Sequence, residues 1–115
     1  MAETTTLYEK VDMTGDIPVP RFGHTITSIS KHKSILFGGA TGDVGKYSMT
    51  GDTYMLNTLK RCWIKLNCQG IVPSPRAAHA SAAIESMQMV VYGGATGGTS
   101  LRSSIINFRR KLGVG

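Results

Sequence analysis

The chain repeats itself with an offset of 55 residues, the distance from Gly38 to Gly93. The run Ser34–Gly42 (SILFGGATG) returns as Met89–Gly97 (MVVYGGATG). Shifting the chain by 55 aligns residues 7–42 with 62–97 without a gap, and 12 of these 36 columns are identical. Average composition would give roughly two identities by chance. A repeat of this period indicates two stacked copies of one supersecondary unit, so both copies must take the same local structure.

One copy of the repeat contains four predicted strands. They are the apolar or β-branched runs His24–Ile29, Ile35–Phe37, Thr53–Leu56 and Arg61–Leu66, and short polar turns separate them at 30–33 and 57–60. In the second copy the run 79–84 is rich in alanine and could form a helix by itself. The repeat instead requires a strand there, because the equivalent first-copy residues are β-branched.

The paired glycines Gly38-Gly39 and Gly93-Gly94 follow an apolar strand in each copy. Three consecutive apolar residues, Ile35–Phe37, predict a strand that is covered on both faces. A glycine pair at its end permits a close approach of another element. We therefore expect a side chain at Gly38 or Gly39 to be costly, and one at Gly42 in the following polar loop to be tolerated.

Four antiparallel strands in about 55 residues, covered on both faces by neighbours, make a propeller blade. The predicted fold class is therefore all-β, an incomplete propeller of four-stranded antiparallel blades. The expected divisions are an outer strand of a closing blade at 7–11, a complete blade at 18–67, the first half of a second blade at 73–101, and a basic tail at 102–115 that departs from the repeat.

The motifs that recur in the same order in both copies resemble those of a Kelch repeat. The first copy has Pro20-Arg21-Phe22-Gly23-His24, then Gly38-Gly39, Tyr54 and Trp63, and the second has Pro75-Arg76-Ala77-Ala78-His79 and Gly93-Gly94. The resemblance implies a Kelch-type β-propeller. It gives a structural signature composed of His24, Gly38, Gly39, Tyr54, Trp63, His79, Gly93 and Gly94.

A closer resemblance covers roughly residues 15–101. Pro75–Ala80 and Tyr92–Gly98 are most similar to the amino-terminal Kelch domain of Kelch-type serine/threonine protein phosphatases of plants and protists. In that family the catalytic domain lies far downstream of the propeller. The metal-binding Asp, His and Asn motifs of that domain have no match here, so the resemblance implies no phosphatase chemistry for these residues.

The charge and composition of the chain disfavour nucleic acid and membranes as binding partners. The net charge is +6, but Arg102, Arg109, Arg110 and Lys111 supply four of the positive charges, within a tail that has no acidic residue. Without an aromatic and basic face, nucleic-acid binding is disfavoured. No apolar run approaches the roughly 20 residues of a membrane span, and the start of the chain has no signal-peptide pattern. Together with two isolated thiols, these features predict a cytoplasmic or nuclear protein that is not secreted.

Catalytic, metal and cofactor sites are not predicted. The glycine-rich segment 38–46 fails the P-loop pattern, because Ala40 stands where the first glycine is required and Tyr47 follows Lys46. His24 and His79 occupy equivalent positions in successive blades, which favours a structural role for each. Cys62 and Cys68 lack the paired short spacing of zinc ligands.

The sequence therefore favours a non-catalytic module that binds an unidentified protein, or a scaffold, and that is a fragment or truncated form of a larger propeller protein. The alternative is the regulatory Kelch portion of a serine/threonine protein phosphatase. Loops on a rigid scaffold usually carry binding. The candidate contact residues are Arg21, Asp43, Lys46, Tyr47 and Arg76. Open blade edges also predict self-association of the isolated chain.

Overall fold

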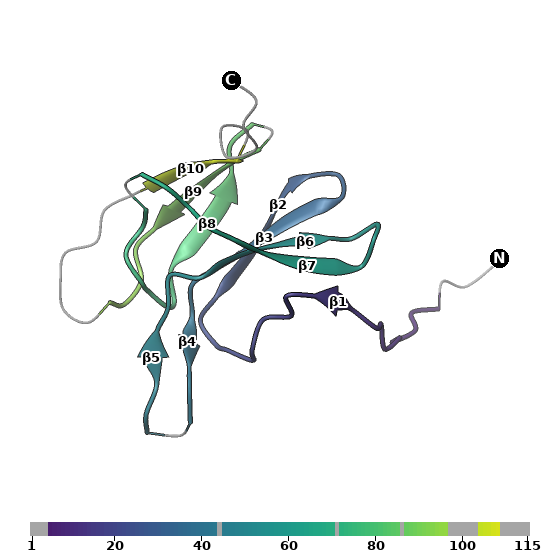
Figure 1. The fold of residues 1–115 in the computed structure, drawn as a ribbon, viewed down its shortest axis with the longest axis horizontal. Coiled ribbons are helices and arrows are strands. Elements are labelled where there is room, and N and C mark those ends of the chain that lie inside the picture. Colours follow the sequence, from purple (N-terminus) through teal and green to yellow (C-terminus); the bar gives the residue numbers. More distant parts are fainter. Residues whose placement is uncertain (1–4, 44, 71, 86, 97–103, 109–115) are drawn as a thin grey trace.

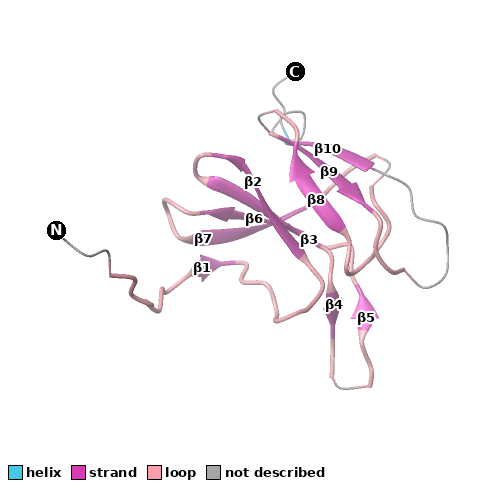
Figure 2. Ribbon diagram, turned by 180° about the vertical axis from the view of Figure 1, so that it is seen from behind, coloured by secondary structure: helices cyan, strands magenta, loops and turns pink. Residues whose placement is uncertain are grey.

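The computed structural model describes residues 5–43, 45–70, 72–85, 87–96 and 104–108. All the elements in this part of the chain are strands, which confirms the all-β prediction. They form sheets of five, three and two strands. The two larger sheets lie side by side, and the smallest projects away from them (Figures 1 and 2). No helix in the described part is long and apolar enough to cross a membrane.

The first blade is a four-stranded antiparallel sheet. Its strands, in spatial order, are β2 (Thr25–Ser30), β3 (Lys33–Phe37), β6 (Thr53–Asn57) and β7 (Cys62–Leu66). Four of the five residues of β3 are buried, as a strand covered on both faces requires. The four strands predicted from the sequence are all present.

The second blade contains β8 (Ala80–Ala83), β9 (Gln88–Tyr92) and β10 (Ser104–Asn107), again antiparallel. The alanine-rich run that could have formed a helix is strand β8, paired along its length with β9. Ladder hydrogen bonds and packing against the first blade therefore outweigh the helix propensity of alanine.

Strand β10 differs from the expectation that residues 102–115 depart from the repeat. In the first blade Asn57 pairs with Lys33, and in the second Asn107 pairs with Gln88, which is equivalent to Lys33. The two asparagines are 50 residues apart, not 55. The chain between the second and third strands is therefore five residues shorter in the second blade, and a search at a constant offset misses this strand. Residues 102–103 and 109–115 lie outside the described part.

The segment 7–11 also differs from the expected outer strand. These residues are exposed, carry no strand, and run away from the sheets in Figure 1. The edge of the first blade is instead extended by the short strand β1 (Thr14–Gly15), which runs parallel to β7. A strand needs a neighbouring strand for its backbone hydrogen bonds, and the described chain offers residues 7–11 none. Closure of a longer propeller by this segment stays a prediction.

The hydrophobic core lies between the two blades. Ile29, Ile35 and Phe37 from the first blade meet Met89, Val91 and Phe108 from the second, and all six are at most 3% exposed. Burying side chains of this size contributes about 1.5–3 kcal/mol each. Each blade thus covers one apolar face of the other.

The paired glycines lie where the two blades come closest. An added Cβ at Gly38 would stand 2.7 Å from the Arg76 carbonyl oxygen and 2.8 Å from the His79 ring. The Gly39 N–H also donates a 2.8 Å hydrogen bond to the Arg76 carbonyl. Gly38 has φ +71°, a conformation that glycine adopts without steric cost. The close approach expected at this pair is therefore an inter-blade contact.

Polar side chains complete the contact between the inner strands. Thr25 Oγ1 and His79 Nε2 share a hydrogen bond of 2.8 Å, and the hydroxyls of Thr27 and Ser81 bond to each other. The His79 ring packs edge-on against Phe37, with ring centroids 5.3 Å apart. Burial lowers the pKa of His79 below its usual 6.5, and the nearby Arg76 guanidinium lowers it further. His79 therefore serves this interface as a neutral ring.

The structure also shows that Gly42 is not the neutral loop position that the sequence suggested. Gly42 has φ +117°, and a Cβ there would stand 2.5 Å from the Lys46 carbonyl oxygen. Gly45 is a better reference, because it has φ +80° and its Cβ would meet nothing within 4 Å.

We predict that Gly38→Ala destabilises the chain more than Gly45→Ala. Both substitutions place alanine at a positive φ, so the difference isolates the clash with Arg76 and His79. We expect a difference on the order of 1–3 kcal/mol in the free energy of unfolding, measured by urea denaturation. Equal destabilisation by the two variants would contradict the close packing of the blades at Gly38.

We also predict that the contribution of His79 to stability depends on pH. Because its folded-state pKa lies below 6.5, the unfolded chain binds a proton more readily than the folded chain does. Stability from this residue is therefore fully present above about pH 6.5 and falls as the pH drops toward the lowered pKa. His79→Gln should flatten this part of the stability profile. A difference between the two proteins that stays constant between about pH 7.5 and pH 5 would refute the coupling.

Candidate interaction surface

A β-hairpin connects the second and third strands of the first blade. It consists of β4 (Ala40–Thr41) and β5 (Ser48–Met49), an antiparallel pair that projects away from both blades in Figure 1. The sequence predicted an exposed loop over residues 40–51, and the structure shows that this segment contains a short hairpin. The glycine-rich turn lets the chain reverse, and the Lys46 N–H closes it by donating 2.8 Å to the Asp43 carbonyl.

The base of the hairpin is fixed by backbone hydrogen bonds. The Phe22 N–H donates to the Ala40 carbonyl at 3.1 Å, and the Ala40 N–H returns a bond of 2.8 Å to the Phe22 carbonyl. On the other strand, the Thr50 N–H donates 2.9 Å to the Gly39 carbonyl. The projecting hairpin is therefore anchored to the same glycine pair that contacts the second blade.

Two aromatic rings are exposed beside this anchored base. The rings of Phe22 and Tyr47 meet edge to face, with centroids 4.8 Å apart and planes at 88°. Phe22 is 52% exposed and Tyr47 is 48% exposed, and Met49, two residues after Tyr47 in the sequence, is 40% exposed. Aromatic residues and methionine are enriched where proteins bind each other. Mutual contact also limits the side-chain freedom that a partner would have to freeze.

Opposite charges accompany these rings. Asp43 and Lys46 are both exposed in the turn of the hairpin. They are close in sequence to Tyr47, so a partner that covered the rings would also meet one acidic and one basic group. We call Phe22, Asp43, Lys46, Tyr47 and Met49 the hairpin surface.

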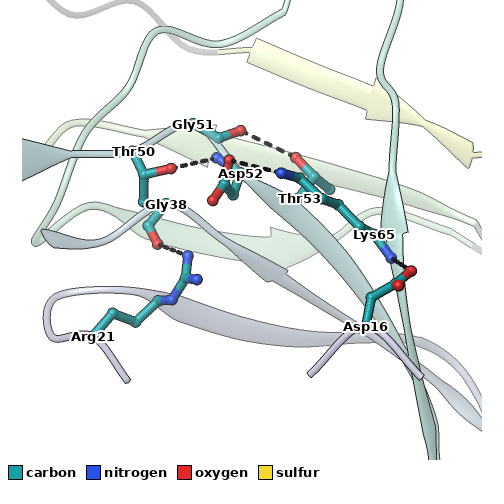
Figure 3. Close-up of polar contacts among 8 residues, drawn as sticks. All are labelled: Asp16, Arg21, Gly38, Thr50, Gly51, Asp52, Thr53 and Lys65. Carbon is teal, nitrogen blue, oxygen red and sulfur yellow. Dashed lines mark hydrogen bonds and ion pairs between the residues drawn. The ribbon is translucent and has the colours of Figure 1, made fainter. Parts of the chain in front are cut away.

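Arg21 belongs to the blade rather than to the hairpin surface. Its Nη1 donates 3.2 Å to the Gly38 carbonyl, a contact drawn in Figure 3, and its Nε donates 3.2 Å to the Val19 carbonyl. Its guanidinium carbon lies 5.4 Å from the centre of the Tyr54 ring, within the range of a cation–π interaction. Arg21 thus ties the proline-rich connector to the strand β3.

Arg76 repeats these contacts in the second blade. Its Nε donates 3.2 Å to the Ser74 carbonyl, and its Nη1 donates 3.4 Å to the Gly93 carbonyl. Only 2% of Arg76 is exposed, because the first blade covers it. The pair was a candidate for partner binding, but the surface that we propose below leaves out both arginines, since the Nε and Nη1 of each bond to carbonyls inside the blades.

One atom distinguishes the two arginines. Arg76 Nη2 donates 3.1 Å to the hydroxyl of Ser74, whereas Nη2 of Arg21 is buried without a hydrogen-bond partner. The repeat explains the difference, because Val19 stands at the position equivalent to Ser74 and has no hydroxyl. A buried donor left unpaired costs free energy.

The remaining signature residues have structural roles. The rings of Tyr54 and Trp63 meet edge to face with centroids 6.4 Å apart, as expected for blade core. His24 packs against Gly39, its Cβ 3.0 Å from where a Gly39 Cβ would stand. Among the residues that the structure describes, no three His, Cys, Asp or Glu side chains gather as they would around a metal ion. Cys62 and Cys68 are free thiols.

A hollow of about 250 Å³ lies beside the outer strand β7. The Nζ of Lys65 and the Oδ1 of Asp52 lie 3.9 Å apart at its wall, and the two side chains are 51% and 37% exposed. Figure 3 shows both residues, with the Lys65 N–H bonded to the carboxylate of Asp16. An ion pair this exposed contributes little stability. The hydrogen bond from Lys65 holds the connector at Asp16 against the blade edge.

The sequence analysis missed Phe22 and Met49 as surface residues. Phe22 was considered only as part of the motif Pro20–His24, and Met49 lies in the polar loop expected after the glycine pair. A signal was present in the comparison of the two copies: Phe22 is replaced by Ala77 in the second copy, and the connection that carries the hairpin is five residues longer in the first blade. Positions that differ between the two copies, rather than identical positions, therefore indicate where one blade has a surface that the other lacks.

Comparisons with known proteins agree with this architecture. Residues 2–108 match the model of the KLHDC2/KLHL20/DRC7 Kelch-repeats domain. The chain is similar to a flagellar outer-arm dynein alpha chain of Chlamydomonas reinhardtii (33% identity, 76% of this chain). It is also similar to the Rho GTPase-activating protein gacHH of Dictyostelium discoideum (33%, 69%) and to the host cell factor homolog hcf-1 of Caenorhabditis elegans (32%, 83%). The aligned part covers only 2%, 5% and 14% of these relatives, respectively.

We predict that Val19→Ser stabilises the chain. The new hydroxyl would accept a hydrogen bond from the unpaired Nη2 of Arg21, as Ser74 does for Arg76, and a satisfied buried donor contributes about 0.5–1.5 kcal/mol. Ser74→Val should destabilise by a similar amount, since it recreates the unpaired donor in the second blade. Chemical denaturation measures both. A stabilising Ser74→Val, or a destabilising Val19→Ser, would contradict this account of the arginine contacts.

Proposed function

The chain belongs to the Kelch-repeat family, and from this premise we propose that it is a non-catalytic module that binds a protein partner through the hairpin surface. The observation that carries the proposal is the exposed edge-to-face pair of Phe22 and Tyr47, held at the base of an anchored hairpin. Kelch domains typically act as protein-interaction modules, and this pair has the chemistry of an interaction anchor.

The proposed partner presents an apolar side chain to these rings, flanked by groups that complement Asp43 and Lys46. The rings and Met49 would supply most of the binding free energy, because large apolar side chains become desolvated at the centre of a contact. The two charged residues would fix the orientation and exclude partners with the wrong charge pattern. Arg21 supports this surface indirectly, by holding the connector that ends in Phe22.

We also propose that these residues serve as part of a larger protein. The relatives with which the chain aligns are much longer than the aligned segment, and a propeller closes with about 4–8 blades. Within such a protein the residues described here would act as scaffold and binding surface. The free thiols Cys62 and Cys68 support a cytoplasmic or nuclear location.

A regulatory role in a serine/threonine protein phosphatase is the alternative. It rests on the motifs Pro75–Ala80 and Tyr92–Gly98. None of the three relatives named above is a phosphatase, so this hypothesis has only the sequence motifs in its support. Sequencing the full transcript tests it, because the hypothesis requires a metal-binding phosphatase motif downstream in the same reading frame.

We predict that the double variant Phe22→Ala/Tyr47→Ala loses partner binding. Peptides selected from a display library on the wild-type protein provide the probe, and the dissociation constant is measured for each. Loss of both rings should weaken binding by about 30-fold or more, equivalent to about 2 kcal/mol.

The matched control is Tyr8→Ala/Leu59→Ala, which removes comparable apolar side chains that are 101% and 69% exposed in other parts of the chain. This control should bind as the wild type does, and both double variants should keep the wild-type circular dichroism spectrum. Selected peptides that bind equally well without the two rings, or a failure to select any peptide, would refute the hairpin surface as the binding site.

A further inference from the structure

The first blade carries a group of positive charges at the end opposite the hairpin, and the proposed function does not use them. The hairpin follows the carboxyl end of β3, whereas the turn at 31–32 precedes its amino end. The turn at 58–61 joins β6 to β7 at that same end, because Lys33 pairs with Asn57 and Asn57 pairs with Cys62. Both turns lie away from the hairpin in Figure 1.

Hydrogen bonds hold these two turns next to each other. The Thr58 N–H donates 2.9 Å to the His32 carbonyl, which links the turns directly. The Lys60 N–H donates 2.9 Å to Asn57 Oδ1 and closes the second turn. The backbones that carry the charged side chains are therefore fixed before a partner arrives, which lowers the entropy cost of binding.

Four cations gather on the two turns without a carboxylate to neutralise them: Lys31, Lys33, Lys60 and Arg61. Neither turn contains an acidic residue. Within the part of the chain that the structure describes, none of the four forms an ion pair. Like charges on adjacent turns repel each other, so this arrangement opposes folding slightly and needs another explanation. We call these four residues the basic turn surface.

The repeat shows that a blade does not require the charges of the first turn. In the second copy, Ser86 and Gln88 stand at the positions equivalent to Lys31 and Lys33. The second blade nevertheless forms the equivalent antiparallel pair of β8 and β9. Lys31 and Lys33 are therefore a property of the first blade alone, as the aromatic pair of the hairpin surface is.

Arg61 is unusual in its backbone conformation. Its φ is +54°, a value that glycine or asparagine adopts at lower cost than arginine. Its carbonyl accepts a 3.1 Å hydrogen bond from the Thr14 N–H of β1, which holds it at the blade edge. The shape of the turn does not account for an arginine at this position, whereas a need for positive charge does.

The side chain of Leu59 favours a protein over a nucleic acid as the partner. It is 69% exposed and lies between Thr58 and Lys60 in the second turn. An acidic peptide with an apolar residue would form ion pairs with the cations and also cover this leucine. Nucleic acids are bound through their phosphates and, when single-stranded, by stacking on aromatic rings, and the basic turn surface contains no aromatic ring.

We propose that the basic turn surface binds an acidic segment of a partner protein, whose carboxylates pair with the four cations and whose apolar side chain covers Leu59. The two blades pack through the faces of their sheets, whereas these turns lie at the ends of strands. The surface therefore stays accessible when further blades pack in the same way in a longer protein. It is a second contact, at the opposite end of β3 from the hairpin surface.

The first test measures binding of a fluorescein-labelled poly-glutamate peptide with a central leucine, by fluorescence anisotropy at low salt. The double variant Lys31→Gln/Lys60→Gln should bind the peptide about 3- to 10-fold more weakly, because it removes two exposed charge contacts. Added salt should weaken binding to the wild type, since exposed charges are screened.

The matched control is Lys10→Gln/Lys46→Gln, which lowers the net charge by the same amount at exposed positions elsewhere. It should change the dissociation constant by less than about twofold, because distant surface charges are screened. A wild-type chain that does not bind the peptide would overturn the proposal. So would equal weakening by the control and by Lys31→Gln/Lys60→Gln, since net charge alone would then explain binding.

The basic tail needs its own control. Counted from the asparagine pair at an offset of 50 residues, Arg110-Lys111 corresponds to Lys60-Arg61, but these tail residues lie outside the described part and are not included in the surface. The variant Arg109→Gln/Arg110→Gln should keep the sensitivity of binding to Lys31→Gln/Lys60→Gln. Binding that is lost in the tail variant and unaffected by the turn variant would assign the contact to the tail and overturn the proposal.

A single-stranded oligonucleotide of similar charge tests the other class of partner. It should compete poorly with the labelled peptide, because it has no apolar group for Leu59. Tighter binding of the oligonucleotide than of the peptide, with the same dependence on Lys31 and Lys60, would overturn an acidic protein segment as the partner in favour of nucleic acid.

A second test locates the contact. A carbodiimide couples carboxylates to amines that lie against them, and mass spectrometry of the digested product identifies the lysines. The peptide should couple to Lys31, Lys33 or Lys60. Coupling confined to Lys10 or Lys46 would contradict the proposed surface.

This proposal does not rest on the hairpin surface. The variant Phe22→Ala/Tyr47→Ala should bind the glutamate peptide as the wild type does, because both rings lie at the other end of the blade. A failure of the hairpin proposal would therefore leave this result unchanged, whereas loss of peptide binding in the ring variant would contradict two separate surfaces.

Discussion

The close approach of two backbones at Gly38 is the contact on which the rest of the structure depends. Without a side chain there, the Arg76 carbonyl can accept a hydrogen bond from Gly39, and the ring of His79 can lie against Phe37. That approach brings together the apolar faces of both blades, whose side chains form the main core. The hairpin depends on the same point, because the Gly39 carbonyl accepts one of the hydrogen bonds at its base. The core packing and the anchoring of the hairpin base thus both involve the same glycine pair.

Equivalent residues of the repeat have different environments, and the difference follows from position in the stack. Phe37 is buried and Tyr92 is exposed, although both end the same strand of their blade. Among the two arginines, Arg76 is buried under the first blade and Arg21 is partly exposed. A repeat protein depends on its neighbours for burial, since no repeat can cover its own apolar faces. Phe37 is therefore buried because the second blade lies against it, and Tyr92 has no such cover among the described residues.

The candidate interaction surface, in contrast, lies at positions where the two copies of the repeat differ in sequence or in length. The longer connection of the first blade folds into an anchored hairpin, and Phe22 contacts Tyr47 where the second copy has Ala77. Identities between copies, such as Arg21 and Arg76, correspond to shared internal contacts with the glycine carbonyls. In this chain the identical positions support the fold, and the divergent positions supply the surface available for binding.

The sequence by itself determined the all-β class, the four strands of the first blade, the two inner strands of the second and the close packing at the glycine pair. Those features depend on local patterns and on a constant offset, both of which can be read along the chain. Only the tertiary structure decided that Ser104–Asn107 is a strand, because its register depends on pairing with β9 across a shortened connection. Likewise, residues 7–11 form no strand because the described chain offers them no neighbour to pair with, and Arg76 is internal because the first blade covers it. Strand pairing and burial depend on residues distant in sequence, so no local pattern could have specified them.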